Sequence, residues 1–335
     1  MMSEKIRWGI MSTAKIARTA VIPAIQNSNR GEVVAIASRN ESRAAEVAAE
    51  LDISKAYGSY DALLADEEID AVYISVPNHM HMEWTIKAAR AGKHILCEKP
   101  AALNEEQVRQ MIEICNQEQV VFAEAFMYRY HPKHARVKEI IESGEIGQVR
   151  AIHANFTYNN CYDTDNVRFK KEMGGGSLYD VGVYPISAAR MYLGQEPEAV
   201  TVHALFSSDH DNVDMMASGL VEFPEKVALT FDCGMWACSR AELEILGTEG
   251  RIELPKVFGW ENSDIPPQII LHTDDVSREE RISVSNSFVL QADAFADAIL
   301  DGTPLPFTPE DALLNIRVVE ACIQSAQRRE RIALL

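Results

Sequence analysis

The first 125 residues alternate short apolar runs with segments of helical periodicity, and this pattern constrains the fold more than any other feature. Asn104, followed three residues later by Gln107, is typical of a helix N-terminus and opens a helix to Gln119. Strands separated by helices form parallel sheets through right-handed crossovers. The pattern therefore predicts a doubly wound Rossmann domain over residues 1–125. Its expected strands are Ile6–Met11, Val33–Ser38, Ala71–Val76, His94–Glu98 and Val120–Ala125, and Ser42–Leu51 is another of its helices.

After residue 125 strand-like runs follow one another with few helices between them. Turns as short as residues 223–226 favour antiparallel pairing, so residues 126–335 are predicted to form an α+β domain with a large, mostly antiparallel sheet. The few helices can cover one face only, which predicts a homodimer or a dimer of dimers. The expected strands are Val149–Tyr158, Ala199–Phe206, Ser218–Glu222, Val227–Cys233, Ala241–Leu246 and Gln268–His272, and the expected helices are His131–Ser143, Leu178–Leu193, Ser287–Leu300 and Pro309–Arg328.

Composition excludes several classes of function. The net charge of −18 argues against a nucleic-acid partner, which usually requires a basic face. No apolar run approaches the roughly 18 residues needed to cross a bilayer, and no cleavable apolar segment precedes the first strand. We therefore expect a cytoplasmic protein without a membrane partner. The six cysteines lack metal-ligand spacing, and His79 and His81 have no Cys or acidic partner nearby, so we expect free thiols and no metal site.

The turn after the first strand has the position of a dinucleotide-binding turn but few of its glycines. Ser12 and Ala14 stand where the G-x-G-x-x-G fingerprint has glycine, and small residues there let the backbone approach a pyrophosphate. An ordinary strand–turn–helix remains an alternative. The candidate cofactor contacts in this turn are Gly9, Ser12, Thr13, Ala14, Lys15 and Ile16.

The end of the second strand favours NADP, with NAD possible. Many NAD-binding proteins have an acidic residue there, whereas an arginine accommodates a 2′-phosphate. This chain has Ser38 and Arg39 at that position and Arg43 one helical turn later, and guanidinium groups suit bidentate contacts to phosphate. The alternative is that both arginines are solvated and neutralised by Glu41.

Two further loops follow buried strands, at the sheet edge where ligands of open α/β sheets bind. In the first, Ser75 and Val76 precede Pro77 and Asn78, which are expected to line the crevice of the nicotinamide ribose, with His81 facing it. In the second, Glu98 and Lys99 precede Pro100, which disfavours a helical conformation for Lys99 and directs its ammonium away from the sheet. A solvated lysine paired with Glu98 is the alternative.

Five motifs, in order along nearly the whole chain, resemble the Gfo/Idh/MocA oxidoreductases. The resemblance is strongest to the branch of NADP-dependent D-xylose 1-dehydrogenases and dimeric dihydrodiol dehydrogenases. Many members of the family have histidine where Tyr184 stands, and the pyrophosphate turn lacks two usual glycines. The motifs are residues 7–10, 77–81, 97–101, 124–132 and 174–184.

The resemblance implies hydride transfer with a nicotinamide, for which the protein must move one proton. Asp180 and Tyr184, spaced i and i+4 on a helix, share one face. A neighbouring Lys99 ammonium would lower the pKa of the Tyr184 phenol and make it a usable general base, with Asp180 orienting Lys99 or a substrate hydroxyl. Lys99 could instead be the proton donor. Residues expected to line the substrate cleft are Tyr128, Arg129, Phe156 and Tyr184.

These features predict an NADP-dependent oxidoreductase acting on the hydroxyl of a sugar, polyol or cyclic diol. An NAD(P)-dependent glycosidase on the same architecture, which oxidises its substrate transiently, is the rival enzyme. The alternative that is not an enzyme is a redox or sugar sensor that binds NADP without turnover. The presence of Lys99, Asp180 and Tyr184 argues against a sensor.

Overall fold

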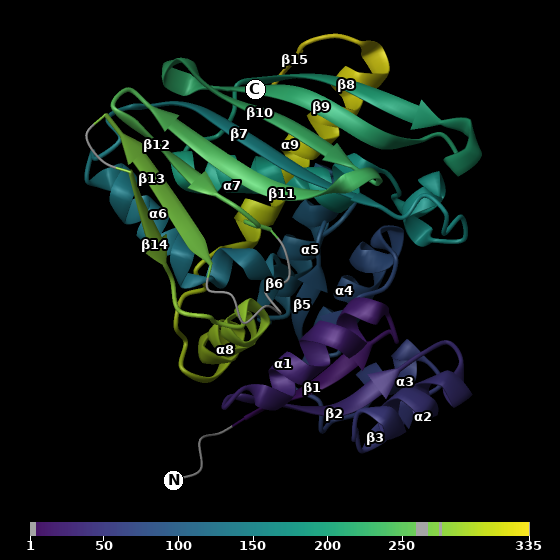
Figure 1. Ribbon diagram of the computed structural model, residues 1–335. Helices are drawn as coiled ribbons and strands as arrows, with labels where there is room; N and C mark the ends of the chain where they lie inside the picture. The colour runs from purple at the N-terminus through teal and green to yellow at the C-terminus, as the bar shows by residue number, and fades with distance from the viewer. Residues whose placement is uncertain (1–4, 259–266, 275–276, 335) are drawn as a thin grey trace. The chain divides into compact units, whose positions relative to one another are not determined.

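The computed structural model describes residues 5–258, 267–274 and 277–334, which divide into two compact units. The first unit contains residues 1–130 and 286–313, and the second contains residues 131–285 and 314–335 (Figure 1). The sequence predicts a single boundary, after residue 125. In the structure residues 286–313 also belong to the first unit, where Phe295 packs against Trp8 with ring centroids 5.2 Å apart.

The first unit is built on a six-stranded parallel sheet, as predicted. The strand order is β3-β2-β1-β4-β5-β6, so the order reverses between β1 and β4. Ligands of such sheets bind beyond the carboxyl ends of the strands at this switch point. The strands are β1 (Ile6–Met11), β2 (Gly31–Ala37), β3 (Lys55–Tyr57), β4 (Ala71–Ile74), β5 (His94–Glu98) and β6 (Phe122–Ala125).

Helices cover both faces of this sheet. On one face, Trp8 and Ile10 of β1 pack against apolar residues of α1 and α8. On the other, Gly9 leaves room for α3, since a Cβ at Gly9 would lie 2.9 Å from Leu63 Cδ2. Asn104 caps α5 as predicted, and its Oδ1 accepts a hydrogen bond from the Gln107 amide at 2.9 Å. The helices are the π-helical turn η1 (Ala17–Val21), α1 (Ile22–Asn27), α2 (Glu41–Glu50), α3 (Tyr60–Leu64), α4 (His81–Arg90), α5 (Glu105–Gln117) and α8 (Ser287–Leu300).

The second unit is built on a nine-stranded sheet of order β14-β13-β12-β11-β7-β10-β9-β8-β15. Its pairs are antiparallel except β7 with β10, which confirms the predicted, mostly antiparallel sheet. The strands are β7 (Val149–Asn159), β8 (Ala199–Ser207), β9 (Val213–Phe223), β10 (Val227–Gly234), β11 (Trp236–Gly247), β12 (Gly250–Leu254), β13 (Gln268–Thr273), β14 (Ser277–Arg281) and β15 (Ile332–Ala333).

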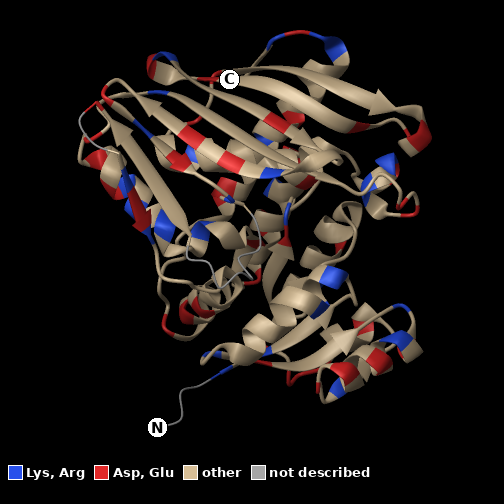
Figure 2. Cartoon of the chain, in the orientation of Figure 1, with Lys and Arg blue, Asp and Glu red and all other residues tan. Residues whose placement is uncertain are grey.

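The two faces of the nine-stranded sheet differ. On one face lie α6 (Pro132–Glu142), α7 (Val183–Leu193) and the part of α9 (Pro309–Arg328) that belongs to this unit (Figure 1). Acidic, basic and neutral residues all occur along the strands of this sheet (Figure 2). The opposite face exposes Leu205 and Leu220, at 47% and 38% of their surface. Among the residues that the structure describes, no helix is long and apolar enough to span a membrane.

Candidate active site

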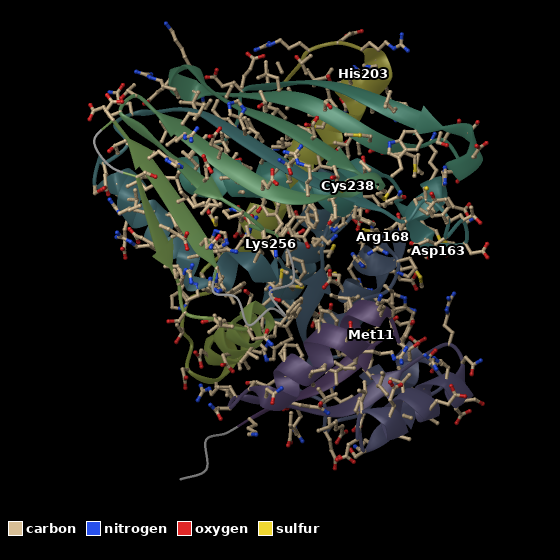
Figure 3. The ribbon with its side chains drawn as sticks, in the orientation of Figure 1. Met11, Asp163, Arg168, His203, Cys238 and Lys256 are labelled. Carbon is tan, nitrogen blue, oxygen red and sulfur yellow. The ribbon has the colours of Figure 1, made fainter. Side chains whose placement is uncertain are left out.

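The turn after β1 combines a glycine-like backbone at Ser12 with the beginning of a helix. Ser12 has a φ of +119°, a conformation that favours glycine, and its amide donates to the Ala37 carbonyl at 3.0 Å. The Ser12 hydroxyl accepts a hydrogen bond from the Ala14 amide at 3.1 Å. A helix begins at Lys15, just beyond Met11 at the carboxyl end of β1, which Figure 3 labels. The turn thus presents a helix N-terminus, which favours an anion.

The end of β2 presents Arg39 to solvent, while Arg43 pairs with Glu46 at 3.0 Å on α2. Tyr60, at the start of α3, lies close to both Arg39 and Ser12. Burial raises the pKa of Tyr60, and the Arg39 charge and the Ser12 hydroxyl oppose this shift. The first unit therefore brings the turn after β1 and Arg39 together around Tyr60. Tyr60 was not predicted from the sequence. The only feature that could have indicated it is its position in the first turn of a helix at this edge of the sheet.

His81 corrects one expectation. It was expected to face the nicotinamide crevice, but its side chain is completely buried. Its Nε2 lies 2.8 Å from the Val76 carbonyl oxygen, and its Nδ1 lies 2.9 Å from that of Pro100. Burial lowers the pKa of His81, an effect that these carbonyl contacts oppose. His81 therefore braces two loops internally, and Val76 is also buried, whereas Pro77 and Asn78 are partly exposed.

Lys99 lies at the carboxyl end of β5 beside a network of carboxylates. Its amide donates to Glu98 Oε2 at 3.3 Å, and the Tyr73 hydroxyl of β4 donates to Glu98 Oε1. The Ala101 amide donates to Glu124 Oε1 at 2.7 Å, and the Lys99–Pro100 peptide is cis. These bonds fix the backbone on both sides of the partly exposed Lys99.

Arg129 and Tyr128 lie inside the first unit, which differs from their expected place in a substrate cleft. The Arg129 side chain is 3% exposed, pairs with Asp311 and lies over the rings of Phe126 and Phe307, at 4.5 and 4.9 Å. Burial would lower the pKa of Arg129, but the Asp311 charge reverses this and the net shift is upward. Tyr128 is 2% exposed and packs edge-on against Phe126. Arg129 therefore has a packing role in this unit.

Gly9 also differs from expectation. It was assigned to the cofactor, but it lies inside β1, and its missing side chain makes room for Leu63 and Ile69. The structure gives Gly9 a packing role.

In the second unit, Asp180 and Tyr184 lie on one continuous helix, as predicted. Asp180 belongs to a π-helical turn, η6 (Leu178–Gly182), and Tyr184 to α7. The Tyr184 ring meets Phe156 edge-on at 5.1 Å, and Phe258 lies 5.6 Å from both rings. Phe156 is therefore placed beside Tyr184. Phe258 was missed, because nothing local to residue 258 marks it as part of the site.

Asp180 is held by two residues that sequence reasoning also missed. The Tyr158 hydroxyl donates to its Oδ2, and Arg168 Nε lies 3.0 Å from its Oδ1. Arg168, labelled in Figure 3, comes from the short turn η4 (Val167–Phe169). Burial raises the pKa of Tyr158, and the Asp180 charge raises it further, so the phenol stays protonated. Asp180 and Tyr184 belong to the second unit, whereas Lys99 belongs to the first.

Comparison with known proteins gives matches to two family models. The model described as "Oxidoreductase family, NAD-binding Rossmann fold" matches residues 6–126, and the "GFO/IDH/MocA C-terminal domain" matches residues 134–253. The chain belongs to the Gfo/Idh/MocA oxidoreductases. The predicted family and the predicted class of enzyme, a nicotinamide-dependent dehydrogenase or reductase, are confirmed.

Relatives within the Gfo/Idh/MocA family include both enzymes of the predicted branch. An NADP-dependent D-xylose 1-dehydrogenase of Haloferax volcanii is 35% identical, and the match covers 98% of this chain and 99% of that enzyme. A trans-1,2-dihydrobenzene-1,2-diol dehydrogenase of Xenopus laevis is 32% identical, and the match covers 77% of this chain and 78% of that enzyme. A solved 3-ketoreductase from Actinomadura kijaniata, in complex with NADP and TDP-benzene, is 30% identical with a TM-score of 0.91, covering 96% and 98%.

The residues of the first unit fit the nicotinamide dinucleotide that this family uses. The turn at Ser12 and the helix N-terminus at Lys15 suit a pyrophosphate, and the exposed Arg39 suits a further phosphate. Over the described part of the chain, no cluster of three or more His, Cys, Asp or Glu could hold a metal ion.

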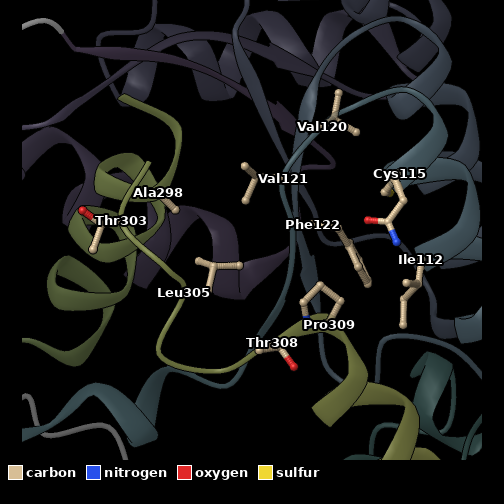
Figure 4. Close-up of a pocket in the computed structure, with 11 residues that line it drawn as sticks. Ile112, Cys115, Val120, Val121, Phe122, Ala298, Thr303, Leu305, Thr308 and Pro309 are labelled. Carbon is tan, nitrogen blue, oxygen red and sulfur yellow. The ribbon is translucent and has the colours of Figure 1, made fainter. Parts of the chain in front are cut away.

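A separate pocket of about 270 Å³ lies in the first unit, at the amino end of β6 (Figure 4). Phe122 and Cys115 line it, and burial raises the pKa of the Cys115 thiol to about 12. Because β6 is parallel to its neighbours, this pocket lies at the sheet edge opposite to the loops that are predicted to bind the cofactor. It is therefore separate from those loops.

Proposed function

We propose that this chain is an NADP-dependent oxidoreductase that acts on a secondary or anomeric hydroxyl, or the corresponding carbonyl, of a sugar, polyol or cyclic diol. The observation that carries this proposal is the arrangement around Tyr184. Its ring packs against two phenylalanines, and one helical turn away a buried carboxylate is held by Tyr158 and Arg168. When bound, the nicotinamide supplies or accepts the hydride.

The cofactor is bound by loops of the first unit in this proposal. Ser12, Thr13, Ala14, Lys15 and Ile16 approach the pyrophosphate through their backbone. Ser38, Arg39 and Arg43 contact the 2′-phosphate. The loops at Ser75, Pro77 and Asn78 and at Glu98, Lys99 and Pro100 border the nicotinamide ribose. The exposure of Arg39 and its closeness to the turn residue Ser12 support a preference for NADP.

Tyr184 moves the proton in this proposal, and Lys99 acts with it as the cation that favours the phenolate. Tyr184 and Phe156 also contact the substrate. Asp180, fixed by Tyr158 and Arg168, holds a substrate hydroxyl as acceptor. Solved forms of the 3-ketoreductase from Actinomadura kijaniata include a tyrosine-to-phenylalanine variant and lysine-to-alanine and lysine-to-glutamate variants, which are the two residue types assigned here.

We also propose that the chain works as a homodimer or a dimer of dimers in the cytoplasm. The exposed Leu205 and Leu220 on the outer face of the nine-stranded sheet support the dimer. The six free cysteines, four of them buried, suit a reducing compartment. Light scattering should show at least a dimer at micromolar concentration, and a stable monomer would contradict this part.

The function is tested by following NADPH absorbance with pentoses, hexoses, inositols, dicarbonyls and aryl glycosides. We expect net oxidation or reduction with at least one sugar, polyol or diol. Release of the aryl group without net change in NADPH would replace the proposal with the glycosidase mechanism. Tight NADP binding with no turnover on the whole panel would indicate a sensor.

A further inference from the structure

Asp214 is a buried carboxylate at the beginning of β9 that the proposed chemistry does not use. It is 6% exposed. Its Oδ2 accepts two hydrogen bonds from the start of the helix that carries Asp180 and Tyr184. The Ser177 hydroxyl donates at 2.7 Å, and the Leu178 amide donates at 2.8 Å. Asp214 therefore caps this helix from a strand 36 residues away in the sequence.

The backbone leaves room for this carboxylate. Gly176, just before the helix, has a φ of +118°, and a Cβ there would lie 2.1 Å from Asp214 Oδ1. A side chain at residue 176 would therefore both strain the turn and displace the carboxylate. The third glycine of the run 174–176 is thus explained by the approach of Asp214 as well as by the turn itself.

Burial makes the ionisation of Asp214 unfavourable. The hydrogen bonds that its carboxylate accepts offset part of this cost. Burial raises the pKa of Asp214 to about 6, while the Ser177 hydroxyl and the Leu178 amide lower it. The ionisable groups beside it are the Cys233 thiol of β10 and the Tyr179 phenol of η6. Burial and the Asp214 charge both raise the pKa of Cys233. Burial, Glu320 and Asp214 raise that of Tyr179, so both neighbours remain neutral.

We infer that ionised Asp214 is a positioning residue that fixes the first turn of the helix and, through it, Asp180 and Tyr184. This inference rests on the proposed function of Tyr184. Asp180 follows the capped Leu178 by two residues, and Tyr184 follows it by six, so a loosened first turn displaces Asp180 first. Hydrogen bonds to an ionised acceptor are stronger than those to a neutral one, so protonation of Asp214 weakens the cap.

The two possible roles of Asp214 give different stabilities for an Asp214→Asn variant. If the carboxylate only stabilised the fold, the variant would be less stable, whereas a positioning carboxylate can be lost without that cost. A carboxyl group whose pKa is raised on folding contributes stability that is present below its unfolded pKa, near 3.8, and is lost as the pH rises through about 6. At pH 8 the charge on Asp214 therefore lowers stability. An Asp214→Asn variant should be at least as stable as the wild type at pH 8, yet less active.

The experiment compares Asp214→Asn with Asp232→Asn, the same change at an exposed-face carboxylate of β10 that accepts from Ser218. We expect Asp214→Asn to lower kcat at least tenfold and to leave the KM for NADP within twofold. Its melting temperature at pH 8 should equal or exceed that of the wild type. Activity of the wild type should fall below pH 6, and the variant should lack this decline. Asp232→Asn should change none of these.

Amide hydrogen exchange gives a readout that does not require activity. Residues 177–184 should exchange faster in Asp214→Asn, and β7 should not. A kcat within twofold of the wild type, or a loss of kcat accompanied by a lower melting temperature and faster exchange throughout the second unit, would overturn the inference. Tyr184→Phe, assayed in parallel, separates the two proposals. If that variant is fully active, the role of Tyr184 is wrong, whereas the cap is judged by the exchange of residues 177–184.

Discussion

The two units differ in how they hold the charged groups of the proposed site. In the first unit, Arg39 projects from the end of β2 into solvent. The second unit keeps Asp180 and Asp214 at least nine-tenths buried, and each accepts hydrogen bonds from fixed neighbours. Each unit nevertheless has a π-helical turn in the helix that follows its key loop, at Ala17–Val21 and Leu178–Gly182, and such turns are frequent at functional sites.

This difference suits the two tasks. An exposed arginine can exchange water for a phosphate and release it again, because its charge is never fully desolvated. Groups that act on the reacting atoms need a fixed orientation, which buried, hydrogen-bonded carboxylates provide at some loss of stability. Mutations of Asp180, Tyr184 and Asp214 in the second unit should therefore affect the chemical step, and mutations of Arg39 and Arg43 in the first unit should affect cofactor choice. Lys99 is the exception.

The largest effect is expected at Tyr184. Tyr184→Phe keeps the packing with Phe156 and removes the hydroxyl, so kcat should fall by roughly 10²–10⁴ while NADP affinity changes little. Lys99→Met should cause a similar loss and move the remaining pH dependence upward, because the phenol loses its cation. The double variant should be little worse than either single one. Steady-state kinetics from pH 5 to 10 measure all three.

Tyr192→Phe is the matched control, because Tyr192 lies on the same helix as Tyr184. The Tyr192 hydroxyl lies 2.6 Å from Nδ1 of His134 on α6. We expect stability to fall by about 1 kcal/mol and kcat to remain unchanged. If Tyr184→Phe keeps more than about a third of the wild-type rate while Lys99→Met is inactive, the proton role belongs to Lys99.

The next largest effect is expected on folding, at Arg129. Arg129→Met removes the buried cation that pairs with the partly buried Asp311 carboxylate, and breaking a buried pair typically destabilises by about 3–5 kcal/mol, so we expect a loss near the lower end of this range. Urea unfolding should show this loss, and adding Asp311→Leu should recover part of it. A loss below about 1 kcal/mol would mean that Arg129 is not a packing residue and would return it to the substrate cleft.

Regular elements with clear apolar boundaries could be predicted from the sequence. β1, β5, α8 and α9 begin and end where the sequence places them, because an apolar run or a helical period ends abruptly at each boundary. β3 was missed, since its three residues are only partly buried and carry no strand signal. The loops after β1, β2 and β5 could be placed because their residues are adjacent in the sequence.

Contacts between distant residues could not be predicted. Arg129 lies within the conspicuous motif 124–132, but its burial depends on Asp311, 182 residues away. The partners of Asp180 are also distant, since Tyr158 precedes it by 22 residues and no local pattern marks it. His81 was misplaced for a related reason. A polar residue beside a cofactor loop can brace the loop from inside, and only the packing of Val76 and Pro100 shows which role it has.

A smaller effect is expected on cofactor choice. Charge-assisted contacts to a 2′-phosphate contribute about 1.5–3 kcal/mol each, so the wild type should prefer NADP to NAD by at least about tenfold in kcat/KM. Arg39→Ala with Arg43→Ala should abolish this preference and leave NAD turnover within a few fold. Arg39→Ala alone should account for most of the loss, because Arg43 is already paired with Glu46.

Arg109→Ala on α5, a surface arginine paired with Glu105, controls for loss of charge and should keep the preference. Equal use of both cofactors by the wild type would show that the end of β2 does not recognise the phosphate.

The smallest effects are expected at one ion-paired, partly buried carboxylate in each unit. A hydrogen bond from Lys55 lowers the pKa of Asp66 to about 2. Hydrogen bonds from Arg136, with the larger effect, and from Arg278 lower the pKa of Glu280 to about 2. The cationic partners of both carboxylates reach solvent, and ion pairs of this kind contribute little, so Asp66→Asn and Glu280→Gln should each lower the melting temperature by about 2–4 °C at most, without changing kcat.

The sign of the pH dependence at these two carboxylates is opposite to that at Asp214. A carboxylate whose pKa is lowered on folding contributes stability that is present above its unfolded pKa, near 4, and is lost as the pH falls through about 2. The difference in melting temperature between the wild type and each variant should therefore be constant from pH 8 to 6 and smaller at pH 3. Thermal melts over this range measure it. A difference that widens on acidification would mean that these ion pairs do not lower the two pKa values, and a change in kcat would mean that these ion pairs influence the chemical step.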